Sequence, residues 1–336
     1  MTRMLYMAAK RPLLAPDSPL AKALREQGEL EIVADGKSLT DEQALEKMRQ
    51  ADVIITHWAA RRIPKELASD PGNVRYILNL GGTCKATVPI EIIRSKIPVT
   101  NWGDTPARAV AEGAMSLLLA VLKDLRPRIE VLVDGKSHNL KKIGLTPGTL
   151  YETRVGLYGC GAIGNKFVEM LQPFQPEIHI YDPYTKELPQ GCQSVQTLDE
   201  LFEKSEIIVI WSGLSAETKG SVNAARLARL PDQGIIINAA RGEIIDQDAL
   251  CVELEKGRLR AGLDVLENDK YILEDHPLHR LPNVILTTHN INAAFWPKRP
   301  PHLNYGDKVA LENIRRFQTE EPLRFVMDED RYLRSS

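Results

Sequence analysis

Residues 155–164 read Val-Gly-Leu-Tyr-Gly-Cys-Gly-Ala-Ile-Gly, an apolar run followed by glycines in the spacing Gly-x-Gly-x-x-Gly. The run from Val155 to Tyr158 has the composition of a buried strand. After it, Gly159 permits a tight turn, Gly161 lets the backbone approach a pyrophosphate, and Gly164 lets the following helix pack closely on the strand. We therefore predict a dinucleotide-binding loop between a strand and a helix.

A helix, a second strand and an acidic residue follow this loop. Asn165 to Leu171 has helical apolar spacing, so the helix start would direct free N–H groups and its positive dipole end toward an anion. Ile178 to Tyr181 is the next predicted strand, and Asp182 follows it directly. A carboxylate there accepts hydrogen bonds from ribose hydroxyls and repels a 2′-phosphate. NAD is therefore favoured over NADP. NADP remains the alternative because Lys186 is a nearby cation.

Composition and charge exclude several classes of protein. The 336 residues are 43% hydrophobic and 26% charged, which is ordinary for a globular enzyme. A net charge of −2 offers no basic surface for nucleic acid, and no run approaches the roughly 20 apolar residues that span a membrane. Charged residues interrupt the N-terminal apolar run, and the 4 cysteines lack metal-binding spacing. We expect a cytoplasmic protein without a metal site.

Strands and helices alternate along the whole chain. The expected strands are Met4–Ala8, Leu30–Val33, Val53–Thr56, Tyr76–Leu80, Pro98–Asn101, Val155–Tyr158, Ile178–Tyr181, Ile207–Trp211, Gly234–Asn238, Ala261–Val265 and Val284–Thr287. Helical patterns between them include Leu20–Gln27, Asp41–Arg49 and Gln247–Lys256, the last closed by Gly257. This alternation predicts an α/β protein with two Rossmann-like or flavodoxin-like parallel-sheet domains.

Two helices indicate how these domains are connected. Ala107 to Leu125 is expected to leave the first domain and pack under the second, and the amphipathic pattern from Lys308 is expected to return to the first. We predict that residues 1–103 plus 299–336 form a substrate-binding domain. Residues 104–298 would form the NAD-binding domain.

Several stretches of the chain resemble the NAD-dependent, D-isomer specific D-2-hydroxyacid dehydrogenases. The shared residues lie at 99–106, 109–112, 155–164, 237–242, 246, 263–265, 288–289 and 312–314. Asn-Ala-Ala-Arg-Gly at 238–242 is the most specific of them. The resemblance implies a discontinuous substrate domain, a central NAD domain, an active-site cleft between them, and a two-fold homodimer. It also implies hydride transfer between NAD(H) and a 2-hydroxy acid/2-oxo acid pair.

The residues themselves also indicate this chemistry. Reducing a 2-oxo acid requires a cation for its carboxylate and carbonyl, and a proton donor beside the carbonyl oxygen. Arg241 and His289 each follow a predicted strand, at the sheet edge where α/β proteins bind ligands. A guanidinium can hold a carboxylate through two hydrogen bonds, and imidazole titrates near neutral pH. The alternatives are a surface ion pair for Arg241 and a capping or core role for His289; the other histidines are expected to be structural.

The carboxylate that would support His289 departs from the family pattern. Family members carry a glutamate a few residues after an Asp-Val pair, whereas this chain reads Asp264-Val-Leu-Glu-Asn-Asp269. Asp269 occupies the matching place and is the predicted partner of the histidine. Because an aspartate is one methylene shorter, the contact requires a backbone shift or is weaker. Glu267 is the alternative if the loop is remodelled.

The predicted substrate and cofactor contacts follow from the same resemblance. Backbone amides of Gly81, Gly82 and Thr83 would hold the substrate carboxylate, and Trp58 would line a side-chain pocket. Two roles remain for Arg61, Arg62 and Lys85: they bind a second acidic group of the substrate, or they are exposed to solvent. The cofactor contacts are Gly159, Gly161, Ala162, Ile163, Gly164, Asp182, Ser212, Gly213, Ala239, Ala240 and Asp264. Asp264 has a physical reason of its own, because a strand-end carboxylate can accept from the nicotinamide carboxamide and orient the ring.

Two other functions remain as alternatives. An NAD(H)-sensing binding protein, similar to corepressors with this fold, would bind the cofactor with little turnover. Formate or phosphite oxidation would use the same architecture, but formate enzymes of this group carry an amide where Asp269 stands. The sequence therefore favours a dehydrogenase.

Overall fold

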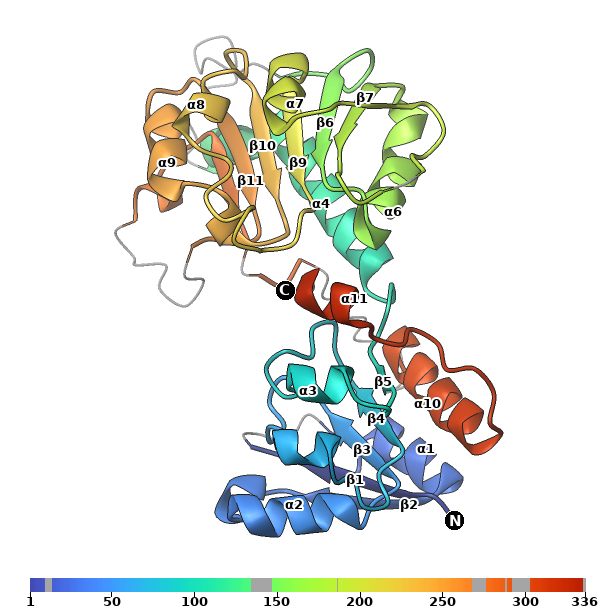
Figure 1. Ribbon diagram of the computed structural model, residues 1–336. Helices are drawn as coiled ribbons and strands as arrows, with labels where there is room; N and C mark the ends of the chain where they lie inside the picture. Colours follow the sequence, from blue (N-terminus) through green and yellow to red (C-terminus); the bar gives the residue numbers. More distant parts are fainter. Residues whose placement is uncertain are drawn as a thin grey trace. The chain divides into compact units, whose positions relative to one another are not determined.

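The protein consists of two α/β units, each built on a parallel sheet (Figure 1). In the computed structural model the described residues are 1–9, 14–133, 147–185, 187–267, 276–287, 289–291 and 303–334. Unit 1 comprises Met1–Thr105 with Trp296–Ser336, and unit 2 comprises Pro106–Phe295. The predicted fold class of two parallel-sheet α/β domains is confirmed.

The sheet of unit 2 carries the glycine loop. Its strands are β6 (Arg154–Tyr158), β7 (Glu177–Tyr181), β8 (Cys192–Ser194), β9 (Ile207–Ile210), β10 (Ile235–Asn238), β11 (Arg260–Leu263) and β12 (Val284–Leu286). In the described residues their order is β12-β11-β10-β9-β6-β7-β8, and every neighbouring pair is parallel. The order reverses between β6 and β9, so the glycine loop after β6 lies at a topological switch point, where α/β sheets bind ligands.

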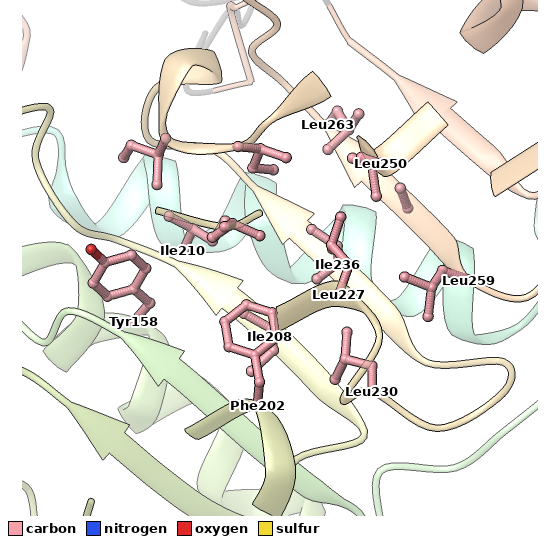
Figure 2. Close-up of a cluster of buried hydrophobic side chains, with 14 of the residues drawn as sticks. Tyr158, Phe202, Ile208, Ile210, Leu227, Leu230, Ile236, Leu250, Leu259 and Leu263 are labelled. Carbon is pink, nitrogen blue, oxygen red and sulfur yellow. The ribbon is translucent and has the colours of Figure 1, made fainter. Parts of the chain in front are cut away.

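Helices cover both faces of this sheet, which explains its continuous apolar strands. One face holds α4 (Ala107–Leu122) and α6 (Ala162–Leu171), which pack on residues such as Val209 and Ile237. The other face holds α7 (Leu198–Lys204), α8 (Ala224–Leu227) and α9 (Gln247–Glu255). Figure 2 shows this second core, where Ile208 and Ile236 pack with Phe202. Successive strand residues therefore alternate between two buried cores.

Unit 1 joins the two ends of the chain around one sheet. Its strands are β1 (Arg3–Met7), β2 (Glu29–Val33), β3 (Val53–Thr56), β4 (Tyr76–Asn79) and β5 (Val99–Thr100), which the described residues arrange in the order β2-β1-β3-β4-β5. One face packs on α1 (Pro19–Gln27) and the C-terminal helix α10 (Tyr305–Gln318). The other packs on α2 (Asp41–Arg49), α3 (Ile90–Ile93) and α11 (Glu329–Arg334).

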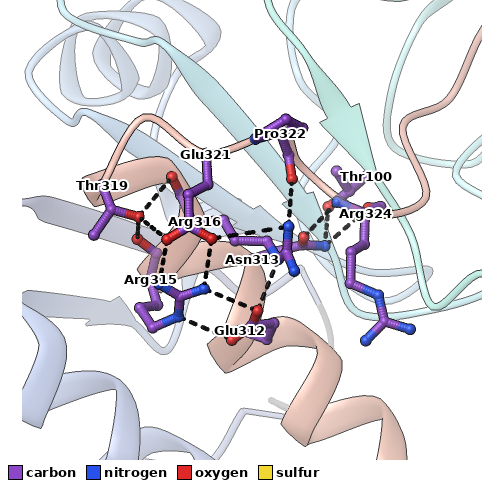
Figure 3. Close-up of polar contacts among 9 residues, drawn as sticks. All are labelled: Thr100, Glu312, Asn313, Arg315, Arg316, Thr319, Glu321, Pro322 and Arg324. Atoms are coloured by element: carbon purple, nitrogen blue, oxygen red, sulfur yellow. Dashed lines mark hydrogen bonds and ion pairs between the residues drawn. The ribbon is translucent and has the colours of Figure 1, made fainter.

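A cluster of charged side chains ends α10 and fixes the turn that follows it (Figure 3). Glu312 accepts hydrogen bonds from Arg315 at 3.0 Å and from Arg316 at 2.7 Å, and Glu321 also accepts from Arg315. These guanidinium groups lower the pKa of Glu312 to about 2. The cluster joins the end of the helix to the segment that leads to α11.

Most element boundaries agree with the sequence prediction. α2 spans the expected residues, and Gly257 after α9 has a positive φ of 67°, as a C-cap requires. α4 ends at Leu122 rather than Leu125, because Asp124 adopts a left-handed conformation and pairs with the buried Arg260 at 3.3 Å. The short edge strand β8 was missed. None of the described helices is long and apolar enough to cross a membrane.

Candidate active site

The glycine loop has the geometry that a dinucleotide requires. Gly159 has a φ of 94°, and a side chain there would lie about 3 Å from the backbone of Ser212. A side chain on Gly164 would lie 3.1 Å from the carbonyl oxygen of Gly159. At Gly161, by contrast, a Cβ would meet no atom within 4 Å, so this position opens to solvent at the start of α6. The loop is close-packed on the protein side and open where a phosphate would approach.

The start of α6 supplies hydrogen-bond donors to this open side. The helix begins at Ala162, earlier than predicted, with Gly161 as its N-cap. In the part of the chain that the structure describes, the N–H groups of Ala162, Ile163 and Gly164 have no acceptor. The side chain of Asn165 donates to the carbonyl oxygens of Cys160 at 2.9 Å and Gly161 at 2.8 Å, which holds the loop in place. These groups fit a pyrophosphate.

Asp182 lies beside the same loop at the end of β7. Its Oδ2 accepts from the backbone N–H of Cys160 at 2.7 Å, and its Oδ1 accepts from Tyr184 at 2.8 Å and Thr185 at 3.1 Å. A carboxylate offers about four acceptor positions, so capacity is left for a ribose hydroxyl. The sequence did not predict that this carboxylate would also join the glycine loop to the turn after β7.

The turn after β10 positions Arg241. The buried side chain of Asn238 donates to the carbonyl oxygen of Arg241 at 2.9 Å and accepts from the N–H of Ala240 at 3.0 Å. A Cβ on Gly242 would lie 2.0 Å from the carbonyl carbon of Leu266, so only glycine fits there. The Asn-Ala-Ala-Arg-Gly motif thus has a structural explanation, because its ends fix the turn that presents Arg241.

The turn that carries His289 is held by Asp264. Oδ1 of the buried Asp264 accepts from the Thr287 hydroxyl at 2.6 Å and from the N–H of Asn290 at 3.2 Å, while its Oδ2 accepts from Ile291 at 3.5 Å. Its carbonyl oxygen accepts from the N–H of His289 at 2.8 Å. His289 itself is exposed and has a φ of 52°. Asp264 therefore fixes a left-handed turn that presents the imidazole.

These two turns lie next to each other. Asn238 and Leu263 are register partners in β10 and β11, and the N–H of Asp264 donates to the carbonyl oxygen of Asn238 at 2.9 Å. The structure therefore brings the Arg241 turn and the His289 turn together at one edge of the sheet. A guanidinium and an imidazole on neighbouring strand ends are the groups that a 2-oxo acid requires.

Some of the remaining predicted residues of unit 2 lie outside the described residues. Asp269, the predicted partner of His289, lies outside the described residues, as does Lys186. Glu267, the alternative, is exposed, and its N–H donates to Gln247 at 3.0 Å. Ser212 and Gly213 follow β9, where Ser212 contacts the glycine loop, and Ala239 lies in the turn after β10.

In unit 1, the loop after β4 presents backbone N–H groups. The carbonyl oxygen of Gly81 accepts from the N–H of Trp102 at 3.0 Å, and that of Gly82 accepts from the side chain of Asn101 at 2.5 Å. Within the described residues, the N–H groups of Gly81, Gly82 and Thr83 have no acceptor. The loop is thus fixed through its carbonyl groups, and its amides are free to bind a carboxylate.

The structure resolves part of what the sequence left open around this loop. Trp58 is 62% exposed. Arg61 is neither solvated nor free for a substrate, because it bonds to the carbonyl oxygens of Gly36 and Leu39 and to Asp41. Lys85 donates to the carbonyl oxygen of Leu333 at 2.8 Å. Arg62 is exposed.

His57, which the sequence assigned a structural role, lies in the core of unit 1. Its Nδ1 accepts from the N–H of Ala59 at 2.6 Å, and its Nε2 lies 3.3 Å from the hydroxyl of Tyr6. Burial lowers its pKa, so the imidazole is held neutral. These contacts fit a packed histidine that fixes the start of the loop containing Trp58.

Residues 115–290 match the family described as D-isomer specific 2-hydroxyacid dehydrogenase, NAD binding domain. The chain is 30% identical to D-3-phosphoglycerate dehydrogenase of Methanocaldococcus jannaschii over 80% of its length, but spans 50% of that protein. It is 29% identical to hydroxypyruvate reductase of Blautia hydrogenotrophica, across 91% of this chain and 94% of that protein. The solved structure of an acyclic imino acid reductase in complex with NADPH and D-Arg is 25% identical, with a TM-score of 0.76 over 96% of this chain and 99% of that one.

Proposed function

Because the chain belongs to the D-isomer specific 2-hydroxyacid dehydrogenase family, we propose that it is an NAD-dependent oxidoreductase that interconverts a 2-hydroxy acid and a 2-oxo acid. The observation that carries this proposal is the hydrogen bond from Asp264 to Asn238, which joins the turns of Arg241 and His289. The sensing alternative is not favoured, because the relatives compared are named as a dehydrogenase and reductases.

The mechanism assigns a separate task to each group. The glycine loop, the start of α6 and Asp182 would hold NADH, which would supply the hydride for the carbonyl carbon. Arg241 binds the substrate carboxylate and polarises the carbonyl group. His289 gives a proton to the carbonyl oxygen in reduction and removes the hydroxyl proton in oxidation. Asp269 is the proposed carboxylate partner of the imidazole, and the amides of Gly81 to Thr83 are proposed to hold the substrate carboxylate from unit 1.

Turnover is tested by the loss of NADH absorbance across a panel of 2-oxo acids. Hydroxypyruvate and glyoxylate are tested first, followed by phenylpyruvate and 2-oxoglutarate as probes of the side-chain pocket. Turnover with any of them, and none without the oxo acid, is the expected result. NADH binding without turnover on this panel or on further oxo acids would return the sensing alternative.

We propose NAD rather than NADP as the cofactor, with unit 2 as the NAD domain and unit 1 as the substrate domain. The position of Asp182 beside the glycine loop supports this choice, since its charge repels a 2′-phosphate. The wild type is expected to prefer NADH over NADPH by about tenfold or more in kcat/KM. Asp182→Asn, which removes the charge, should lose most of this preference. A wild type that uses NADPH better would contradict the proposal.

We also propose a homodimer in the cytoplasm. On α5 (Leu125–Val133) the apolar side chains of Leu125, Ile129 and Val133 are exposed along one stripe, which would be covered in a dimer. Ile129→Asp should therefore shift the sedimentation coefficient from dimer to monomer, because a buried carboxylate without a partner destabilises an interface. Val252→Asp on α9, also an exposed apolar residue, is the matched control and should leave the dimer intact. A monomeric wild type would contradict the proposal.

A further inference from the structure

The loop of Gly81 to Thr83, which follows β4, is held by the C-terminal end of the chain. The side chain of Asn101 is the link: its Nδ2 donates to the carbonyl oxygen of Gly82 at 2.5 Å, and its Oδ1 accepts from the N–H of Gly103 at 2.9 Å. The same Oδ1 also accepts from Nη2 of Arg331 at 2.9 Å. The guanidinium of Arg331 on α11 thus orients the side-chain amide of Asn101, and that amide holds the loop at Gly82.

Arg331 is held by hydrogen bonds within its own segment. The side chain of Asp328 accepts from the N–H of Arg331 at 2.7 Å, and Nη1 of Arg331 donates to the carbonyl oxygen of Val326 at 3.3 Å. Its guanidinium is therefore held by its own segment before it meets Asn101. Since hydrogen bonds from a charged donor are stronger than neutral ones, Arg331 fixes which way the Asn101 amide points. That orientation is the one in which Nδ2 faces Gly82.

The segment before α11, which contains Arg324 and Val326, is held beside β5 by hydrogen bonds. The buried Asn313 donates to the carbonyl oxygen of Arg324 at 3.0 Å and accepts from its N–H at 2.8 Å (Figure 3). Val326 then forms an isolated antiparallel bridge with Thr100, next to Asn101. Residues more than 200 positions apart are in this way brought to the same loop.

α11 also holds the residues that follow the loop. The hydroxyl of the buried Tyr332 donates to the carbonyl oxygen of Val88 at 2.8 Å, and Lys85 donates to that of Leu333 at 2.8 Å. Cys84 packs in the same core as Tyr332. The loop of Gly81 to Thr83 is therefore fixed by α11 through Asn101 and again through the residues just after Thr83.

We propose that Arg331 is a positioning residue for substrate binding, which acts through Asn101 to hold the loop whose amides bind the substrate carboxylate. The proposal rests on the proposed function. It differs from a general stabilising role because the contact ends at the Gly82 carbonyl, whose peptide group carries the N–H of Thr83. If Asn101 turns away, that N–H changes direction and the carboxylate loses a donor.

Arg331→Met tests the proposal. The KM for the 2-oxo acid should rise roughly tenfold, which is the expected effect of one hydrogen bond to a charged group. The KM for NADH and kcat should change less than about twofold. Arg94→Met is the matched control, because it removes an exposed ion pair between α3 and Glu329 of α11 that does not reach the loop. An unchanged KM for the oxo acid, or an equal rise in the KM for NADH, would overturn the proposal.

Hydrogen exchange gives a second readout that does not depend on turnover. The amides of Trp102 and Gly103 donate to Gly81 and to the Asn101 side chain, so peptides covering residues 99–105 should exchange faster in Arg331→Met and not in Arg94→Met. If the wild type reduces none of the oxo acids, the proposed function fails and exchange alone decides. Unchanged exchange in Arg331→Met would then overturn the role of this residue.

Discussion

Arg241→Lys is expected to lower kcat/KM for the 2-oxo acid by about 10²–10³-fold while NADH binds with nearly the same affinity. Arg241 lies in a turn fixed by Asn238 and Gly242, and its Nη1 donates to the carbonyl oxygen of Ala240 at 2.6 Å. A lysine keeps the charge but lacks the planar pair of donors that matches a carboxylate. The loss therefore reports hydrogen-bond geometry rather than charge, and steady-state kinetics with an NADH titration by fluorescence measure it.

Arg229→Lys provides the matched control for this substitution. Arg229 forms ion pairs with Asp199 and Glu203 near the surface of the same unit, away from the strand end that carries Arg241. The control should change kcat/KM by less than about twofold, since such pairs contribute little. If Arg241→Lys kept more than about a third of the wild-type kcat/KM, Arg241 would not be the group that binds the carboxylate.

Local signals in the sequence were sufficient for the architecture. Apolar runs of four or five residues predicted strands such as β3 and β10, because both faces of each sheet are buried. The helical pattern of Asp41–Arg49 predicted α2 with the bounds that the structure has. Gly159 and Gly257 were placed by the conformations that only glycine adopts readily. Each of these features depends on residues close together in the chain.

Features that depend on distant contacts were not predictable in the same way. Arg61 was left between substrate and solvent, but it bonds to backbone at Gly36 and Leu39, which its neighbours in sequence do not indicate. Lys85 was left open for the same reason, and its partner Leu333 lies near the other end of the chain. Asp264 was assigned to the carboxamide of the cofactor. Its contacts with the His289 turn became visible only once β11 and β12 lay side by side.

His289→Gln is expected to lower kcat by about 10²–10⁴-fold, because glutamine cannot transfer a proton to the carbonyl oxygen. NADH affinity should change little. A variant that kept more than about a tenth of the wild-type kcat would show that another group gives the proton.

Asp264→Asn then distinguishes the two roles available to that carboxylate. Asp264 accepts hydrogen bonds from Thr287, Asn290 and Ile291, and an amide NH₂ cannot accept, so the left-handed turn of His289 should loosen and kcat should fall by roughly 10–100-fold. If Asp264 acts through His289, its substitution adds little once the imidazole is gone. The double variant should then match His289→Gln within about threefold in kcat. If instead the two losses multiply and NADH affinity falls with Asp264→Asn alone, the carboxylate acts on the nicotinamide carboxamide independently of the histidine.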